Sequence, residues 1–192
     1  GIVLFAHGSG SSRHSRRNRF VAGQLQRAGL GTLLMDLLTL EEEREDKITA
    51  QLRFNIALLG HRVVGALDWL AAQEETRSLT VGCFGASTGA AAALLAAAKR
   101  PAIVKAVVSR GGRPDLAEEF LPSILAPTLL IVGGDDLPVI GMNQSALNKL
   151  NCVKELQILP GASHLFEEPG ALEAVARLAG QWFSVHLNSD NT

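Results

Sequence analysis

Short apolar runs alternate along this chain with longer stretches in which apolar residues return every third or fourth position. The short runs are typical of buried strands, whereas the longer spacing is typical of helices with one apolar stripe. The strand-like runs cover residues 2–6, 32–35, 79–84, 103–108, 128–132 and 153–159, and the clearest helical stretches cover residues 51–73 and 172–185. This order predicts right-handed crossovers and a three-layer α/β/α sandwich around a mainly parallel six-stranded sheet.

Two segments depart from this simple pattern. Residues 153–158 alternate partly between apolar and polar side chains, which predicts a strand at the sheet edge with one face in water. Residues 41–47 are all charged, so the simplest interpretation is a solvated loop or short helix. No repeat, low-complexity tract or linker divides the chain, and we expect residues 1–192 to form a single domain.

Composition narrows the class of protein. A chain of 192 residues with 47% hydrophobic residues can bury a core without help from disulfides or metal. A net charge of -1 gives no overall attraction to nucleic acid or to a membrane surface, and no apolar run is long enough to span a bilayer. Cys83 and Cys152 do not make a disulfide framework, so two buried thiols in a reducing cytoplasm are expected.

One short motif stands between the third apolar run and an alanine-rich run. It reads Gly85-Ala86-Ser87-Thr88-Gly89, an order that predicts a strand, a sharp turn and a helix. The small residues let the backbone double back, and the serine hydroxyl is then exposed. The unpaired amides at the start of the helix point to where negative charge develops in acyl transfer.

Acidic and histidine side chains follow two later strands. Asp135 and Asp136 come directly after the fifth apolar run, and His164 follows the sixth. Because the carboxyl ends of parallel strands meet at one edge of a sheet, these groups are expected near Ser87. A serine hydroxyl needs an imidazole to take its proton and a carboxylate to orient the imidazole. The chain order therefore predicts a serine, acid and histidine triad.

These motifs together resemble the α/β-hydrolase superfamily, and the chain is similar over nearly its whole length to the dienelactone-hydrolase-like group. The resemblance implies that Ser87 is the nucleophile and that His164 is the base. In this family the acid usually stands three residues after the first glycine of its turn. That place belongs to Asp136, with Asp135 as the alternative.

The first loop of the chain resembles the oxyanion loop of the same family. It reads His7-Gly8-Ser9-Gly10 and follows the first strand-like run. The resemblance implies that the backbone N–H groups of Ser9 and Thr88 receive the oxyanion. His7 itself is expected to shape this loop.

The chain also departs from the family. Dienelactone hydrolases proper carry cysteine where this chain has Ser87, and Cys83 stands four residues too early to replace it, so dienelactone is not the expected substrate. The family's first strands are absent, which predicts the strand order 2-1-3-4-5-6 in this chain's own count. Only residues 109–126 stand where lipases often insert a lid. We therefore expect a minimal fold with an open site and no large lid.

Other interpretations use the same residues. Gly8-Ser9-Gly10 follows a strand and precedes a helix, and Asp36 ends the next strand where a dinucleotide-binding fold holds ribose. However, Arg13 replaces the third glycine of that motif. A catalytically silent module that only binds partners is a further alternative. Metal binding is not expected, because His7 and His14 have no third ligand beside them.

Arginines gather on either side of the predicted site. They are Arg13, Arg16, Arg17, Arg19, Arg110 and Arg113. Several cations at a helix N-terminus oppose the helix dipole, and this unfavourable placement suggests that they have a function. A solvated surface is the alternative interpretation. We expect both groups to border one entrance and to attract a substrate with a carboxylate or phosphate, with Arg13 and Arg110 as candidate binding residues.

The sequence thus predicts a serine hydrolase that cleaves small carboxylic esters through an acyl-enzyme. No cofactor, metal, nucleic acid or membrane partner is expected. The identity of the ester and the oligomeric state do not follow from the sequence, because loop conformations decide the shape of a pocket.

Overall fold

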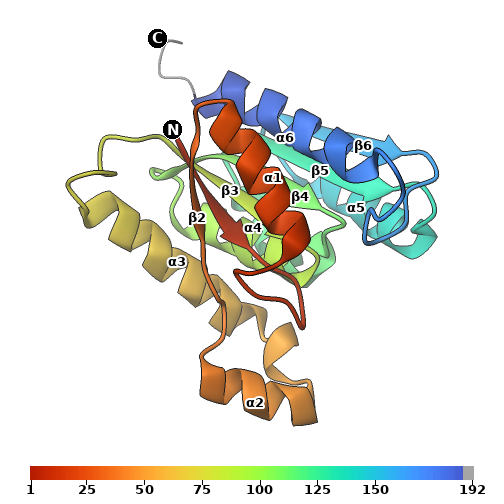
Figure 1. The fold of residues 1–192 in the computed structure, drawn as a ribbon, viewed down its shortest axis with the longest axis horizontal. Helices are drawn as coiled ribbons and strands as arrows, with labels where there is room; N and C mark the ends of the chain where they lie inside the picture. The colour runs from red at the N-terminus through yellow and green to blue at the C-terminus, as the bar shows by residue number, and fades with distance from the viewer. Residues whose placement is uncertain (188–192) are drawn as a thin grey trace.

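The six apolar runs form one parallel sheet in the computed structural model, which describes residues 1–187 (Figure 1). The strands are β1 (Ile2–Ala6), β2 (Gly31–Leu34), β3 (Val81–Ala86), β4 (Val104–Arg110), β5 (Thr128–Gly133) and β6 (Lys154–Leu159). They lie in the order β2-β1-β3-β4-β5-β6, and every neighbouring pair is parallel. The order predicted from the sequence is confirmed, and β6 lies at an edge as expected.

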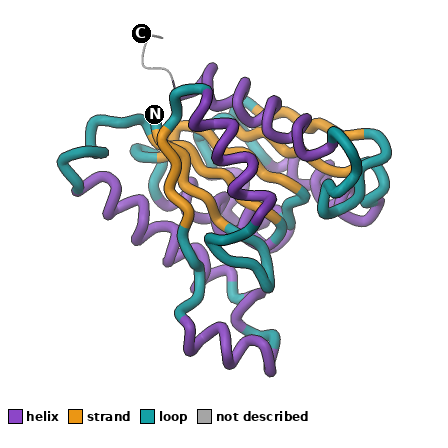
Figure 2. The backbone as a smooth tube through the Cα atoms, viewed as in Figure 1, coloured by secondary structure: helices purple, strands orange, loops and turns teal. Residues whose placement is uncertain are grey.

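Helices cover both faces of this sheet, which makes the predicted three-layer sandwich. The α-helices are α1 (Arg16–Arg27), α2 (Leu40–Thr49), α3 (Ile56–Ala72), α4 (Thr88–Lys99), α5 (Leu137–Lys149) and α6 (Ala171–Leu187). Two 3-10 helices, η1 (Leu52–Phe54) and η2 (Pro114–Ser123), complete the elements. Helices α1 and α6 lie together on one face, and α3, α4 and α5 lie on the other (Figure 1). Helix α2 projects beyond the end of β2 (Figure 2).

Two apolar cores result from the alternation of side chains along the central strands. In β1, Val3 and Phe5 face α1 and α6, whereas Leu4 and Ala6 face α3 and α4. Each of these four side chains is at most 1% exposed. Both faces of the strand are therefore apolar, as a sheet between two helical layers requires.

The observed helix α3 covers Ile56–Ala72 and is shorter than the helix predicted over residues 51–73. The structure begins α3 at Ile56, because the Asn55 side chain accepts a hydrogen bond from the Leu58 N–H at 3.0 Å and caps the helix. The charged stretch before it forms α2, which a capping box between Thr39 and Glu42 starts. Of the two interpretations of residues 41–47, the helix is therefore the one observed.

The turn after β3 depends on two glycines. A Cβ at Gly85 would lie 2.4 Å from Ala90 Cα, and a Cβ at Gly89 would lie 2.3 Å from the carbonyl oxygens of Ala6 and His7. Contacts this short do not occur for real side chains, so the helix after Ser87 can approach β1 only without a side chain at position 89. The two glycines of the motif are thus needed for packing as well as for the turn.

Gly89→Ala tests this close approach. The added methyl would force α4 away from β1, and we expect a loss of roughly 2 kcal/mol or more in the free energy of unfolding. Gly65→Ala is the matched control, since nothing lies within 4 Å of a Cβ there. In the exposed face of α3 the control is expected to stabilise by about 0.5–1 kcal/mol. Urea unfolding measures both, and equal stability of the two variants would contradict the packing argument.

Candidate active site

Ser87 lies on a strained turn at the carboxyl end of β3. Its φ and ψ angles are 51° and -122°, a backbone conformation that residues other than glycine rarely adopt. The turn is held by its backbone: the Ser87 N–H donates to Arg110 O at 3.2 Å, and Ser87 O accepts from the N–H groups of Ala90 and Arg113. The side chain is partly exposed. The geometry expected from the sequence, with the serine between strand and helix, is present.

His164 and Asp136 form a hydrogen-bonded pair at the same edge. His164 Nδ1 lies 2.6 Å from Asp136 Oδ2, and the Asp136 side chain is 12% exposed. Asp135 is exposed, and its backbone N–H donates to Ala162 O at 3.0 Å. Of the two aspartates that the sequence left open, Asp136 is the one that contacts the imidazole.

The loop that carries His164 packs tightly against two other strand ends. A Cβ at Gly133 would lie 2.3 Å from Ala162 O. The turn that carries Asp136 can therefore come this close to the loop only because residue 133 is glycine. At Gly111 the Cβ position is 3.5 Å from His164 Cε1. Gly111 directly follows Arg110, whose carbonyl holds Ser87. Within residues 1–187 no hydrogen bond joins the Ser87 hydroxyl to His164, and such bonds are often long in unliganded sites.

The loop after β1 lies beside the start of α4. Ser9 Oγ and Thr88 Oγ1 are 3.0 Å apart and share a hydrogen bond. The backbone N–H groups of both residues donate no hydrogen bond to residues 1–187, as expected for the first turn of a helix and for an open loop. Two free amide donors therefore lie on neighbouring segments next to Ser87.

His7 fixes this loop to the segment after β2. Its Nε2 accepts a hydrogen bond from the Leu37 N–H at 3.0 Å, and its Nδ1 lies 2.9 Å from Gly8 O. A nitrogen that accepts from an amide carries no proton, so Nδ1–H donates to Gly8 and the ring is neutral. The structure thus gives His7 the shaping position expected from the sequence.

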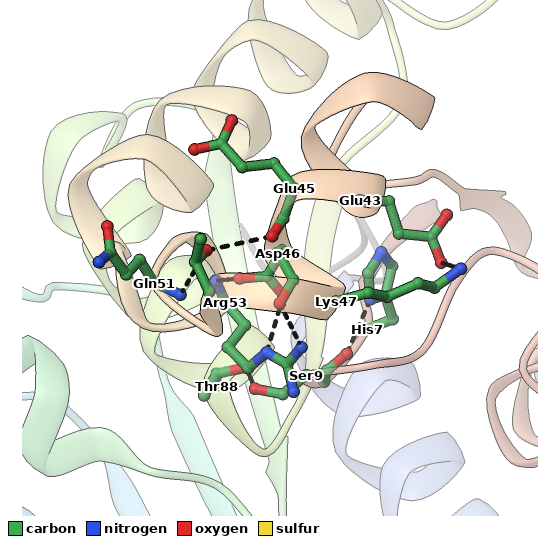
Figure 3. Close-up of polar contacts among 11 residues, drawn as sticks. His7, Ser9, Glu43, Glu45, Asp46, Lys47, Gln51, Arg53 and Thr88 are labelled. Atoms are coloured by element: carbon green, nitrogen blue, oxygen red, sulfur yellow. Dashed lines mark hydrogen bonds and ion pairs between the residues drawn. The ribbon is translucent and has the colours of Figure 1, made fainter.

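A cavity of about 460 Å³ opens beside Ser9 and Thr88. The loop after β1 forms one wall, and the segment from Asp36 through α2 to Arg53 forms the other (Figure 3). Lys47, Glu43 and His14 add charged or polar atoms to an apolar lining from Leu37, Leu38 and Leu59. The sequence analysis did not predict that α2 forms a wall of this cavity. The sequence feature that could have indicated the helix is the capping box formed by Thr39 and Glu42.

An ion pair between the buried Asp46 and the partly buried Arg53 holds this second wall together. Arg53 Nε lies 2.7 Å from Asp46 Oδ2, the Arg53 N–H donates to Asp46 Oδ1 at 2.9 Å, and Arg53 Nη2 donates to Asp46 O at 2.8 Å (Figure 3). Burial alone would raise the pKa of Asp46, but the hydrogen bonds and charge of Arg53 outweigh it and lower the pKa below its ordinary value. The ionised pair therefore ties α2 to η1.

The candidate binding arginines lie in different surroundings. Arg13 is on the cavity wall, and Asp36 accepts from its backbone N–H at 2.6 Å and pairs with its guanidinium. Arg110 is only 7% exposed and packs over the Phe166 ring on the face of α1 and α6. Arg13 therefore lines the cavity, whereas the Arg110 side chain turns inward and does not line it, and the binding role expected of both residues stays a prediction.

The remaining expectations concern metals, thiols and the lid. Within residues 1–187 no three His, Cys, Asp or Glu side chains are grouped to hold a metal ion, and no helix is both long and apolar enough to cross a bilayer. Burial raises the pKa of Cys83 to about 12, whereas Cys152 is only partly buried. Residues 109–126 contain η2, which packs on α4 and α5 and does not line the cavity.

Comparison with known proteins gives a family. The family model described as the dienelactone hydrolase family matches residues 1–184. A crystal structure of dienelactone hydrolase from Anabaena variabilis is 66% identical, covers 98% of this chain and 87% of its own, and has a TM-score of 0.96. Est1E from Butyrivibrio proteoclasticus has a TM-score of 0.77 at 15% identity, over 95% of this chain and 88% of its own, and shows the fold alone.

The curated relatives carry a different name. Two Mycobacterium tuberculosis proteins named "Putative phosphoribosyl transferase" are each 59% identical over 187 residues. The match covers 97% of this chain but 41% of each relative. The chain thus spans less than half the length of the curated relatives it matches.

The Asp136 contact predicts a proton signal that is independent of any reaction. A short hydrogen bond deshields the His164 Nδ1 proton, and we expect a downfield, exchange-protected resonance. Asp136→Asn should abolish or shift it, whereas the matched variant Asp135→Asn should leave it in place. Proton NMR near neutral pH measures all three proteins, with His164→Gln to assign the signal. An unchanged resonance in Asp136→Asn would exclude the pairing.

The ion pair of the cavity wall predicts a pH dependence. Because folding lowers the pKa of Asp46 below 3.8, the pair stabilises the fold above that value and loses its effect as pH falls through the lowered pKa. Asp46→Asn should therefore unfold at lower urea than the native chain near neutral pH. The difference should shrink below about pH 4. A difference that stays constant from neutral pH to pH 3 would show that ionisation of Asp46 is not its cause.

Proposed function

This chain belongs to the dienelactone hydrolase family, and we propose that it cleaves small carboxylic esters with Ser87 as the nucleophile. The observation that carries the proposal is the 2.6 Å contact between His164 and Asp136 at the sheet edge where Ser87 is presented. A carboxylate and an imidazole in contact are what a serine hydroxyl needs to become reactive. The family and fold support hydrolysis, and the serine mechanism is our proposal.

Each residue has one role in the proposed reaction. His164 Nε2 takes the Ser87 proton as Oγ bonds to the ester carbonyl carbon, and the Asp136 carboxylate holds Nδ1–H and stabilises the imidazolium. The carbonyl oxygen becomes an oxyanion, which the N–H groups of Ser9 and Thr88 receive. His164 then returns the proton to the departing alkoxide, leaving an acyl group on Ser87. Water, deprotonated by His164, attacks this ester and restores the free hydroxyl.

The cavity supports esters of modest size. At about 460 Å³ it lies in the range of small-molecule pockets, and it opens beside the two amide donors of the proposed oxyanion site. Its lining mixes apolar side chains with paired charges, which does not suit a long aliphatic chain. A short acyl or alcohol portion is therefore the proposed occupant.

The name of the Mycobacterium tuberculosis relatives does not conflict with this proposal. Their match to this chain covers 41% of each protein, so the name describes proteins of more than twice the matched length. We propose that the matched part supplies ester hydrolysis. The proposal makes no statement about transfer of a phosphoribosyl group by the rest of those relatives.

The nucleotide-binding alternative loses support at Asp36. A ribose needs a free carboxylate at the end of β2, but both oxygens of Asp36 are engaged by Arg13, one by its N–H and one by its guanidinium. A catalytically silent module remains the second candidate, and it predicts the same fold without a reactive serine.

Ser87→Ala is the direct test of the nucleophile. Loss of the hydroxyl should lower kcat for 4-nitrophenyl acetate by about 10⁴-fold or more and abolish labelling by a fluorophosphonate probe. The melting temperature should hardly change, since a partly exposed hydroxyl contributes little to stability. Ser78→Ala is the matched control, because Ser78 is exposed and stands before the amino end of β3 whereas Ser87 follows its carboxyl end, and this variant should keep both activities.

Each alternative has its own result in this experiment. A native chain that is neither labelled nor active, but whose melting temperature rises with NAD⁺ or ATP, would favour nucleotide binding. A chain with none of these responses would favour the silent module. Full labelling of Ser87→Ala would show that another residue is the nucleophile.

A further inference from the structure

Arg110 is a buried cation without a partner. It ends β4 and is 7% exposed, and its Nε is completely buried without a hydrogen bond. Within residues 1–187 no atom of its guanidinium donates a hydrogen bond or meets a carboxylate. Its guanidinium lies over the Phe166 ring, whose centroid is 5.7 Å from Cζ. A ring face replaces only part of the solvation that a guanidinium loses on burial.

Arg17 reaches the same loop as Arg110, since it pairs with Glu167, the residue after Phe166, and it also lacks a complete set of partners. Arg17 extends from the first turn of α1, and its Nη1 lies 3.0 Å from Glu167 Oε1, but its Nε is buried and unpaired. Burial, and after it the positive charge of Arg17, lowers the pKa of Arg110 to about 10. The buried guanidinium of Arg110 and the partly exposed guanidinium of Arg17 repel each other, and an anion bound between them would relieve this repulsion.

Three other arginines of the region pair with carboxylates. Arg13 pairs with Asp36, Arg53 with Asp46, and Arg113 with Asp115. Arg113 is the informative comparison, since it stands three residues from Arg110 and holds both oxygens of Asp115. The chain thus supplies acids to its neighbours and, within the described residues, none to Arg110.

The unpaired cation lies directly beside the proposed catalytic groups. The carbonyl of Arg110 accepts the Ser87 N–H, and the ring under its guanidinium belongs to Phe166, two residues after His164. The Cβ position of Gly111 is 3.3 Å from Phe166 Cε2 and 3.5 Å from His164 Cε1. The phenyl ring and the imidazole therefore both lie next to Gly111. The Arg17 side chain is 32% exposed, which gives an anion access from solvent.

We propose that Arg110 and Arg17 together bind an oxoanion, a carboxylate or a phosphate group, of the substrate. Guanidinium groups match both kinds of oxoanion through paired N–H donors. The bound anion supplies the negative charge that the protein itself does not provide. The substrate class is then an ester with a second, anionic group, an assignment that rests on the proposed hydrolase function, whereas anion binding itself does not.

Binding is tested without any reaction. The melting temperature of the native chain should rise in millimolar inorganic phosphate or succinate relative to sodium chloride of equal ionic strength. Arg110→Met should lose this rise and, without anion, should melt at or above the native temperature, because an unpaired buried charge has been removed. Arg110→Lys should keep part of the rise. Arg113→Met, the matched control, should keep all of it.

The source of the oxoanion is separated by comparing the two salts and the two classes of ester. A rise with phosphate alone, or with succinate alone, identifies the group; either result supports the site. For 4-nitrophenyl hemisuccinate against 4-nitrophenyl butyrate, the ratio of kcat/KM should fall about ten- to hundred-fold in Arg110→Met. 4-Acetoxyphenyl phosphate against 4-nitrophenyl acetate makes the same comparison for phosphate.

Two results would overturn the proposal. One is a native melting temperature that neither salt raises. The other is Arg110→Met that melts lower than the native chain yet keeps its full response to anion, which would make Arg110 a support for Phe166. If the chain binds anion but cleaves no ester, the site stands and the proposed function fails, so the two failures are distinguishable.

Discussion

The close approach of Gly89 to the carbonyl oxygens of Ala6 and His7 is the contact on which the rest of the site depends. Because no side chain separates α4 from β1, the start of the helix lies beside the loop that carries Ser9. Ser87 then lies in a turn with positive φ after the carboxyl end of β3, where its side chain is partly exposed. Backbone packing thus brings nucleophile and amide donors together before any polar contact does so.

Charge at this edge is organised by pairing. Asp136 is paired with His164, Asp36 with Arg13, and Asp46 with Arg53, so most of the carboxylates near the cavity have defined partners. A charge with a partner of opposite sign can hold a loop in place, whereas an unpaired buried charge lowers the free energy of unfolding. Arg110 is such an unpaired charge next to Ser87, which is why we assign it a ligand and not a structural role.

The sequence was sufficient for the parts of the fold that depend on local patterns. Apolar runs predicted the six strands, the family resemblance implied their order, and the chain order of Ser87, an aspartate and His164 predicted the candidate site. The family resemblance favoured Asp136 but left Asp135 as an alternative, since one residue of register in the turn decides which carboxylate faces the imidazole. The cavity wall from α2 and the inward turn of Arg110 were not predicted from the sequence, because both depend on contacts between residues distant in the chain.

The central claim is that hydrolysis passes through an acyl group on Ser87. Rapid quenching of the native chain during turnover of 4-nitrophenyl butyrate, followed by intact-mass analysis and peptide mapping, tests it most directly. The account predicts a population carrying a single butyryl group, with the added mass on the peptide that contains Ser87. Turnover without an adduct, or an adduct on another residue such as Cys83, would contradict it.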